Sequence, residues 1–311
     1  MPSTQELKRR TKAVTNIKQI TKAMEMVAAT KMRRSQEIAL RSRSYAVEIL
    51  RLLGELTEKT NYLPDIMKSR SINKTTLVLV AADRGLAGSF NANIFRSFEK
   101  WLNKHNDKLL LYSFIAVGKK AEEFLSRKGF SMAASFKNFG DYIKTKETRP
   151  LSHLLTDNFL KGGCDQVIIF STHFRTTLRQ EVMIRELLPI TAERVKQAIK
   201  EIIPEYGRYA NLGTGDDIEE QVQSSQFEYL IEPDSKSVLD ALAPQLLEIV
   251  IHDFILEANA SEHAARRLAM KTASDNASDL GSALNLQYNK SRQGAITSQI
   301  IEIIAGAESL N

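Results

Sequence analysis

The sequence predicts an α/β protein in which the N- and C-terminal segments form a long antiparallel two-helix coiled coil around a central Rossmann-like α/β domain. Proline is absent from residues 3–63 and again after Pro244, so little interrupts a helix at either end of the 311-residue chain. Between these ends, apolar runs of strand length alternate with amphipathic stretches. We therefore expect shaft-like helices over 1–62 and 235–311 and an α/β domain over 73–230.

The N-terminal segment carries an apolar repeat. Its apolar side chains recur mostly at steps of three, four or seven, which is typical of a helix lying along a partner. A helix of about 55 residues would be about 80 Å long, more than a globular domain requires. The positions of this predicted stripe are Leu7, Val14, Ile17, Ile20, Met24, Val27, Met32, Ala39, Ala46, Ile49, Leu53 and Leu56.

The C-terminal segment carries a second repeat, built from smaller side chains. Small residues let two backbones approach closely, at the cost of less apolar burial than a leucine-rich zipper offers. Because neither end has a leucine-rich seam, we expect the two helices to pair within one chain; a homodimer is the alternative. The predicted facing positions are Ala265, Leu268, Thr272, Asn276, Leu280, Ala283 and Gln287.

The middle of the chain has the pattern of a parallel sheet with crossover helices, because strand-like and helix-like segments alternate. Residues 204–226 contain few large apolar groups and two close glycines, which predicts a loop or a surface insertion. The predicted strands are 75–82, 108–118 and 165–174, with an edge strand in 178–190, and the predicted crossover helices are 91–105 and 119–130.

Composition indicates a folded chain with an uneven charge. Hydrophobic residues make up 43% and charged residues 26%, which is close to ordinary globular usage. The longest apolar stretches, such as 246–256, are interrupted by charges well short of the roughly 20 residues of a membrane span, so any membrane association is expected to be indirect. Residues 1–60 hold 13 Lys plus Arg against 6 Glu, or +7, whereas the whole chain is +6. A basic segment of this kind favours an acidic protein surface or a nucleic acid as partner.

The usual patterns of catalytic and cofactor sites are not met. The segment 83–91 follows a predicted strand, where a phosphate loop would lie. Its glycines, Gly85 and Gly88, have only G-x-x-G spacing, which favours a structural turn. The five histidines show no metal-ligand spacing. Cys164 is the single cysteine, which excludes an intrachain disulfide, and we expect it to be a buried apolar residue. No catalytic, cofactor-binding or metal-binding residue is predicted.

Four segments, in order along the chain, resemble motifs of the gamma subunit of the F-type ATP synthase. The resemblance is strongest over about 4–45 and 227–311. It implies an antiparallel two-helix shaft inside a hexamer of alpha and beta subunits, with the α/β domain at a foot that meets the epsilon subunit and the membrane c-ring. The matching segments are ITKAMEMVAATKMRRSQ (20–36), ADRGLAGSFN (82–91), EYLIEPD (228–234) and EHAARRLAMKTASDNASDLGSALNLQYNKSRQGAITSQIIEIIAGA (262–307).

The resemblance also implies roles for individual residues. Arg292 and Gln293, with Thr297 nearby, would form a polar catch to a catalytic subunit, for which the bidentate fork of arginine is suited. Met24 and Arg266 would couple the helices to the hexamer; core packing and a surface ion pair are their structural alternatives. An apolar tip would turn in a bearing, and a foot would contact the ring and epsilon. The tip residues are Ile300, Ile301, Ile303, Ile304 and Leu310, and the foot residues are Tyr229, Glu232, Asp83 and Arg84.

A member of this family would perform no bond chemistry itself. It would couple ion flow through the ring, by protons or sodium ions, to ATP synthesis or hydrolysis, because an asymmetric shaft contacts three identical catalytic subunits differently. Ala87 and Ile231 depart from residues common in the family, and the paired-cysteine loop of chloroplast members is missing, which argues against thiol control. The first residues resemble neither a secretory signal nor an organellar presequence, so we expect a bacterial protein, peripheral on the cytoplasmic face of the inner membrane.

Two rival functions follow from the same residues. A basic helical arm on an α/β domain could bind nucleic acid, with an affinity that depends steeply on salt. A Rossmann-like enzyme with a coiled-coil appendage would instead require a nucleotide cofactor. The apolar tip argues against the first, and the incomplete glycine motif argues against the second.

Overall fold

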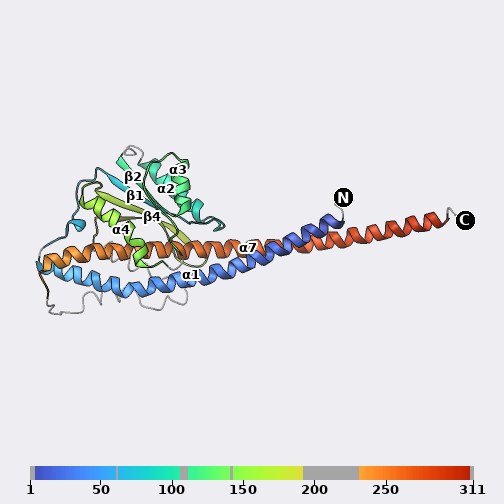
Figure 1. Ribbon diagram of the computed structural model, residues 1–311, viewed down its shortest axis with the longest axis horizontal. Helices are drawn as coiled ribbons and strands as arrows, with labels where there is room; N and C mark the ends of the chain where they lie inside the picture. The colour runs from blue at the N-terminus through green and yellow to red at the C-terminus, as the bar shows by residue number, and fades with distance from the viewer. Residues whose placement is uncertain (1–3, 61, 106–110, 141–142, 192–230, 309–311) are drawn as a thin grey trace. The chain divides into compact units, whose positions relative to one another are not determined.

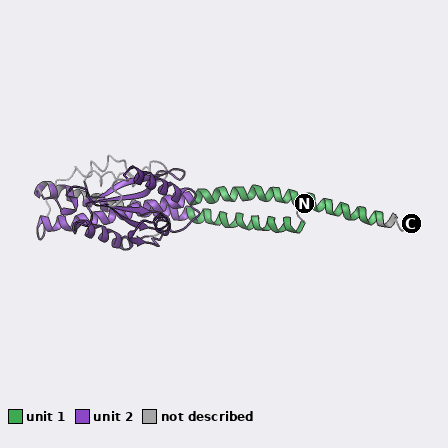
Figure 2. Ribbon diagram, turned by 90° about the horizontal axis from the view of Figure 1, so that it is seen from above, with its two compact units in different colours: residues 1–28, 266–311 green, residues 29–265 purple. Residues whose placement is uncertain are grey.

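The computed structural model divides into two compact units. Unit 1 comprises residues 1–28 and 266–311, and unit 2 comprises residues 29–265 (Figure 2). The two predicted long helices are confirmed: α1 spans Thr4–Thr60 and α7 spans Ser235–Glu308 (Figure 1), and each contributes to both units. The division into segments 1–62, 73–230 and 235–311 stays a prediction. The structure describes residues 4–60, 62–105, 111–140, 143–191 and 231–308.

Unit 1 is an antiparallel pair of helices. Lys18 bonds to Ser278, and a Cβ placed on Gly281 would lie 3.7 Å from Val14 Cγ1, so residue numbers rise on α7 as they fall on α1. Most inward-facing positions are buried or half-buried and alternate between steps of three and four, the heptad repeat of a coiled coil. They are Leu7, Thr11, Val14, Lys18, Thr21, Glu25 and Ala28 on α1, of which Lys18 is exposed, and Met270, Ser274, Ala277, Gly281, Leu284, Tyr288 and Ser291 on α7.

The predicted facing positions were partly wrong. Ile17, Ile20 and Val27 are exposed on α1, although the apolar repeat included them. On α7 the buried face lies one or two positions beyond the predicted one and includes Met270, Ala277 and Leu284. Small residues occur on both of these neighbouring faces, so the pattern of small side chains did not distinguish the face that meets the partner helix. The exposed members of the predicted α7 stripe are Leu268, Thr272, Asn276, Leu280, Ala283 and Gln287.

Unit 2 is built on a five-stranded sheet of order β3-β2-β1-β4-β5. The first four strands are parallel and β5 runs antiparallel to β4, which confirms the predicted parallel sheet and its edge strand. The elements, in chain order between α1 and α7, are η1 (Asp65–Met67), β1 (Thr75–Val80), α2 (Phe90–Lys104), β2 (Tyr112–Val117), α3 (Lys119–Arg127), β3 (Met132–Phe136), α4 (Thr145–Leu160), β4 (Gln166–Phe174) and β5 (Gln180–Leu188).

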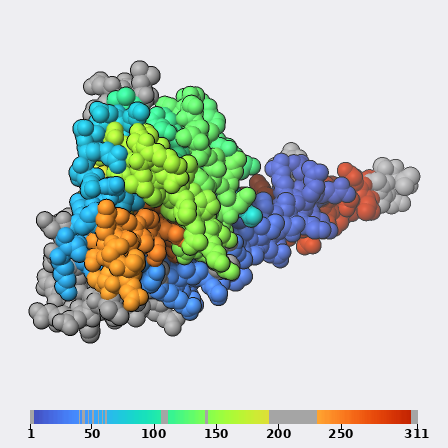
Figure 3. Space-filling model, turned by 60° about the vertical axis from the view of Figure 1, so that its left-hand side comes forward, coloured from blue at the N-terminus to red at the C-terminus, as the bar shows by residue number. Residues whose placement is uncertain are grey.

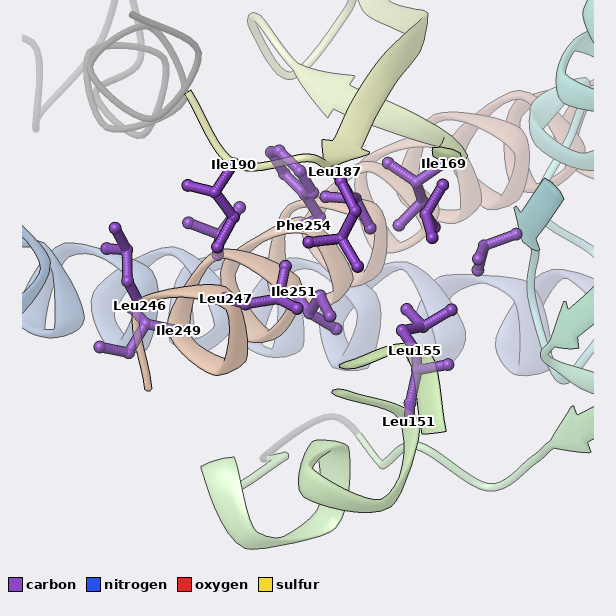
Figure 4. Packing of buried hydrophobic residues seen from close by; sticks show 14 of the residues in the cluster. Leu151, Leu155, Ile169, Leu187, Ile190, Leu246, Leu247, Ile249, Ile251 and Phe254 are labelled. Atoms are coloured by element: carbon purple, nitrogen blue, oxygen red, sulfur yellow. The ribbon is translucent and has the colours of Figure 1, made fainter. Parts of the chain in front are cut away.

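The sheet is covered on both faces. On β1, Leu77 and Leu79 pack with α2 and α3 in one core, whereas Val78 and Val80 pack with α4, α1 and α7 in the other. Alternate residues of a strand point to opposite faces, so both sets must be apolar for the strand to be buried. Figure 4 shows the second core, in which side chains of α7 lie between those of α4 and the sheet.

Three elements were not predicted: the short η1, the strand β3 and the helix α4. The strand β3 has the short, half-exposed sequence MAASF of a sheet edge, in which two of the apolar residues are small alanines. The helix α4 contains Pro150, a residue that argues against a helix interior. The predicted insertion at 204–226 lies outside the described residues.

Candidate functional site

The C-terminal end of α7 extends beyond the helix pair. Tyr288 and Ser291 are half-buried, and every described side chain from Arg292 to Ala305 is exposed. Four isoleucines in this segment have exposed fractions of 51% (Ile300), 60% (Ile301), 72% (Ile303) and 56% (Ile304). Contiguous exposed apolar groups mark a surface for another protein. The fifth predicted tip residue, Leu310, lies outside the described residues.

The three predicted catch residues lie at the start of this unpaired segment. Arg292, Gln293 and Thr297 are all exposed on α7. The Thr297 hydroxyl donates to the Gln293 carbonyl oxygen at 3.0 Å, which ties it to its own helix. The structure thus presents one cation and one side-chain amide within two turns, next to the apolar tip.

Met24 and Arg266 lie elsewhere in unit 1. Both are half-buried, Met24 on α1 and Arg266 on α7. Arg266 is 26 residues before Arg292 in the chain, or about 39 Å along a helix. These residues therefore do not converge on one pocket but are distributed along an elongated surface.

Exposed apolar side chains also occur along the paired part of unit 1, and sequence reasoning missed them as surface groups. Ile17, Ile20, Met26 and Val27 on α1 are exposed, and so is Leu280 on α7. They stand among cations such as Lys22, which pairs with Glu25 at 2.9 Å. The seam of this helix pair mixes apolar with small and polar residues, and the pair also leaves apolar groups on its outer surface, which indicates that the outer surface is a contact surface.

The loop after β1 carries the predicted foot residues Asp83 and Arg84. The Asp83 carboxylate accepts a hydrogen bond from the backbone N–H of Lys119 at 2.9 Å, at the first turn of α3. Arg84 is exposed. Because the aspartate fills a helix N-terminus, a position that suits anions, this contact is a structural tie.

The rest of this loop folds back on unit 2. The Ala82 N–H donates to the Asn91 side-chain oxygen at 3.1 Å, and Ala87 and Phe90 pack against Ala265 of α7. Leu86 has φ 62° and is 65% exposed. These contacts are those of a structural turn, as the incomplete glycine motif predicted.

The remaining foot residues lie just before α7. Glu232 is exposed, and Tyr229 lies outside the described residues. Asp234 caps the helix by accepting hydrogen bonds from the N–H and the hydroxyl of Ser237, which lower the pKa of its carboxyl. The cap fixes where α7 begins and so positions Glu232 at the end of unit 2.

Other kinds of site find little support among the described residues. They contain no cluster of three or more His, Cys, Asp or Glu side chains placed to hold a metal ion. Cys164 is buried, and burial raises the pKa of its thiol, which disfavours the reactive thiolate. None of the described helices has a stretch long and apolar enough to span a membrane.

The fold defines a class of protein. The chain superposes on a chain of the central stalk and c-ring structure of the Tetrahymena thermophila mitochondrial ATP synthase, with a TM-score of 0.58 and 24% identity, covering 82% of this chain and 99% of that one. A chain of the Euglena gracilis mitochondrial ATP synthase gives a TM-score of 0.62 at 16% identity, covering 99% and 94%. The chain therefore has the fold of these ATP synthase chains.

Sequence comparison is more specific. The family model described as ATP synthase matches residues 3–310. The ATP synthase gamma chain of Roseiflexus castenholzii is 36% identical over 313 residues, covering 100% of this chain and 99% of the relative. That of Moorella thermoacetica is 35% identical over 311 residues, with both chains fully covered. The chain belongs to the ATP synthase gamma-chain family. These relatives give no support to the nucleic-acid-binding alternative.

Proposed function

We propose that this chain is the central rotary shaft of an F-type ATP synthase and that it couples ion flow through a membrane ring to ATP synthesis and hydrolysis. Its role is mechanical, and the catalytic sites belong to other subunits. The observation that carries the proposal is the unpaired segment 292–305, whose side chains are all exposed and in which a polar catch precedes the isoleucines at 300, 301, 303 and 304. An exposed apolar helix end needs an apolar sleeve.

The proposed partners follow from the surfaces. Alpha and beta subunits would enclose unit 1, with the basic residues of α1 facing acidic loops and Arg292 pairing with a carboxylate. Met24 and Arg266 would contact the same hexamer lower on the shaft. The epsilon subunit and the c-ring would contact the foot through Asp83, Arg84, Tyr229 and Glu232. The complex would lie on the cytoplasmic face of a bacterial inner membrane, consistent with its bacterial relatives.

An asymmetric shaft is sufficient for this function. A partner shifts a conformational equilibrium only by its differential free energy for the two states. The exposed side chains of α1 and α7 differ around the circumference of the pair, so three identical catalytic subunits would each meet a different surface. Rotation of the shaft would then move each subunit through binding, reaction and release in turn.

The proposal is tested by single-molecule rotation. The Ser126→Cys variant places a thiol on the exposed face of α3, while the native Cys164 is buried. The full chain is assembled with the alpha and beta subunits of the same organism, and a bead is attached to the new thiol. We expect stepwise rotation on addition of ATP. Hydrolysis without rotation, or failure of the chain to co-purify with a membrane-attached ATPase, contradicts the proposal.

A further inference from the structure

A thirteen-residue part of α7 inside unit 2 is buried on every face. All thirteen residues from Leu246 to Ala258 are buried, yet four of them are ionisable: Glu248, His252, Asp253 and Glu257. Helices surrounded by protein are normally apolar all round. Ionisable groups at such positions are costly to bury unless they are paired, so their partners are informative.

Two of these residues bind one side of α7 to α4. Arg149 on α4 directs its Nε to both oxygens of the Glu248 carboxylate, at 3.0 and 3.2 Å. The Nε2 atom of His252 lies 3.1 Å from the carbonyl oxygen of Ile143, just before α4. In the space-filling view the start of α7, drawn orange, lies beside α4, drawn yellow-green (Figure 3).

Glu257 binds α7 to the sheet. One carboxylate oxygen lies 3.0 Å from His173 Nδ1 on β4, and the other lies 3.8 Å from Arg185 Nη1 on β5. Arg185 also lies over the ring of Phe254, 4.6 Å from its centroid, and donates to Ser171 at 3.4 Å. One carboxylate therefore joins α7 to the two strands of the antiparallel edge.

The two sets of contacts lie on opposite sides of the helix. Glu248 and Glu257 are nine residues apart, or about two and a half turns of an α-helix. Figure 4 shows apolar side chains of the same region, with Ile251 and Phe254 of α7 between Leu151 and Leu155 of α4 and Leu187 of β5. Each set of contacts acts on side chains at the surface of the helix, away from the helix axis.

Apolar contacts hold a helix in a core but are non-directional, whereas hydrogen bonds such as Arg149–Glu248 and His173–Glu257 weaken steeply when their geometry changes. Two directional contacts on opposite sides oppose rotation of the helix about its own axis in both senses. We infer that the Arg149–Glu248 and His173–Glu257–Arg185 contacts form a torsional lock that fixes the angle of α7 within unit 2. This inference rests on the proposed function: α7 is one continuous helix from Ser235 to Glu308, so the lock would carry torque from the foot into the shaft.

The lock is tested first in the isolated full chain. Spin labels at Ser126→Cys on α3 and Ala241→Cys, an exposed position of α7, report the angle of α7 by the width of their distance distribution. We expect Glu257→Gln to broaden this distribution. The matched control is Glu99→Gln, which makes the same chemical change in the surface pair with Lys128 at 2.5 Å. An unchanged width in Glu257→Gln contradicts the lock.

A second variant separates the lock from stability. Glu257→Gln with Arg185→Met replaces the ion pair by groups of similar size, a change that is often neutral or stabilising in a protein interior. We expect this double variant to melt at or above the wild-type temperature and still to give the broadened distribution. A wild-type width in a stable double variant means that the cluster only stabilises the fold, and the inference is then wrong.

The rotation assay tests the mechanical consequence. With the bead on Ser126→Cys, the angular variance of the bead during a catalytic pause measures the compliance between foot and hexamer. We expect Glu257→Gln to raise this variance by about twofold or more, because the charge-assisted bond to His173 is weakened and the ion pair with Arg185 is lost, and Glu99→Gln to leave it unchanged. If the wild-type chain does not rotate, the shaft proposal fails, while the spin-label widths still decide whether the lock exists.

Discussion

Lys18 on α1 donates a hydrogen bond from Nζ to Ser278 Oγ on α7 at 2.9 Å, and this bond joins residues 260 positions apart in the sequence. It lies at a seam position that most two-stranded coiled coils fill with an apolar side chain. The seam of unit 1 thus mixes polar groups such as Lys18 with buried apolar ones such as Leu7 and Leu284, while further apolar groups face outward. The predictions below test this arrangement and the contacts of unit 2.

Gly281→Ala should stabilise the helix pair by about 0.5–1 kcal/mol, because alanine is the better helix former. The added Cβ would lie 3.7 Å from Val14 Cγ1, an ordinary contact. Hydrogen exchange of residues 270–290 measures the effect. Gly294→Ala is the control, since its Cβ would meet nothing within 4 Å. Gly281→Leu should instead be destabilising by about 1–3 kcal/mol through overpacking; a stabilised Leu variant contradicts the close seam.

Gly118→Ala should destabilise unit 2 by about 3 kcal/mol or more. Gly118 has φ +94°, and a Cβ there would lie 1.9 Å from the backbone oxygen of Ala81, so the strand ends and the Asp83 tie would have to move. Urea denaturation gives the loss. Gly129→Ala separates the two causes, because Gly129 has φ +78° with open space around it. It should lose only about 1–2 kcal/mol. Equal losses of stability in Gly118→Ala and Gly129→Ala would mean that the steric clash with Ala81 adds nothing to the cost.

His252 should make unit 2 more stable at low pH than at high pH. Burial lowers its pKa, but the Asp253 carboxylate 3.6 Å from Nδ1, the hydrogen bond to the Ile143 carbonyl and the charge of Glu248 outweigh this effect, so the pKa is raised overall. A histidine whose pKa is higher in the folded chain than in the unfolded chain stabilises the fold when it is protonated. This stabilisation is fully present below the pKa of the unfolded chain, about 6.5, and is lost as the pH rises through the pKa of the folded chain.

The matching experiment compares wild type with His252→Gln, which keeps a donor for Ile143 but does not titrate. The stability difference from urea denaturation should be larger at pH 6 than at pH 9, by at most about 1.4 kcal/mol per pH unit for one proton. His153→Gln removes an exposed imidazole from α4 and is the control. A difference that is independent of pH would mean that His252 does not titrate in the native chain.

Arg292→Ala should lower coupled ATP synthesis in inverted vesicles by about tenfold or more, because losing one partner of a desolvated charge pair costs about 2 kcal/mol or more. Arg292→Lys should recover little, since lysine lacks the bidentate fork. Lys290→Ala removes an exposed cation from the preceding turn and should have a small effect. Normal synthesis by Arg292→Ala counts against the catch, provided that the melting temperature of the isolated chain is unchanged.

Deletion of residues 300–311 should reduce torque and shaft retention while leaving the isolated chain nearly as stable as wild type, within about 0.5 kcal/mol. The reason is that Ile300, Ile301, Ile303 and Ile304 are exposed and so contribute little to folding. Leu155→Ala in the buried core should by contrast be destabilising by about 2–5 kcal/mol. Calorimetry of the wild type, the deletion variant and Leu155→Ala measures these effects. A large loss of stability on deletion would mean that the tip packs within its own chain.

Much of the fold could be predicted because the local sequence patterns were strong. Long proline-free segments predicted α1 and α7, and apolar runs predicted β1, β4 and the edge strand β5. The seam of unit 1 could not be predicted by the same rule, since Thr11, Thr21 and Ser274 face the partner while Ile17 and Ile20 do not. An apolar repeat predicts which helix faces are covered, but it does not distinguish a face covered by the partner helix from a face that another protein would cover.

The candidate sites were predictable only in part. Arg292, Gln293 and the isoleucines were identified by family resemblance, and the structure adds that they are exposed on an unpaired helix end. The buried residues Glu248 and Glu257 gave no signal, because a charge within an apolar run does not reveal its partner. Arg149 and His173 lie 99 and 84 residues away from them, so only the folded chain brings the pairs together.

The outward-facing isoleucines of unit 1 have a consequence for biogenesis. A newly made chain without its neighbours displays Ile17, Ile20 and Ile303 to solvent, where such groups promote aggregation and recognition by chaperones and proteases. An orphan copy should therefore be short-lived, and its abundance in a cell should follow the supply of the subunits that enclose it.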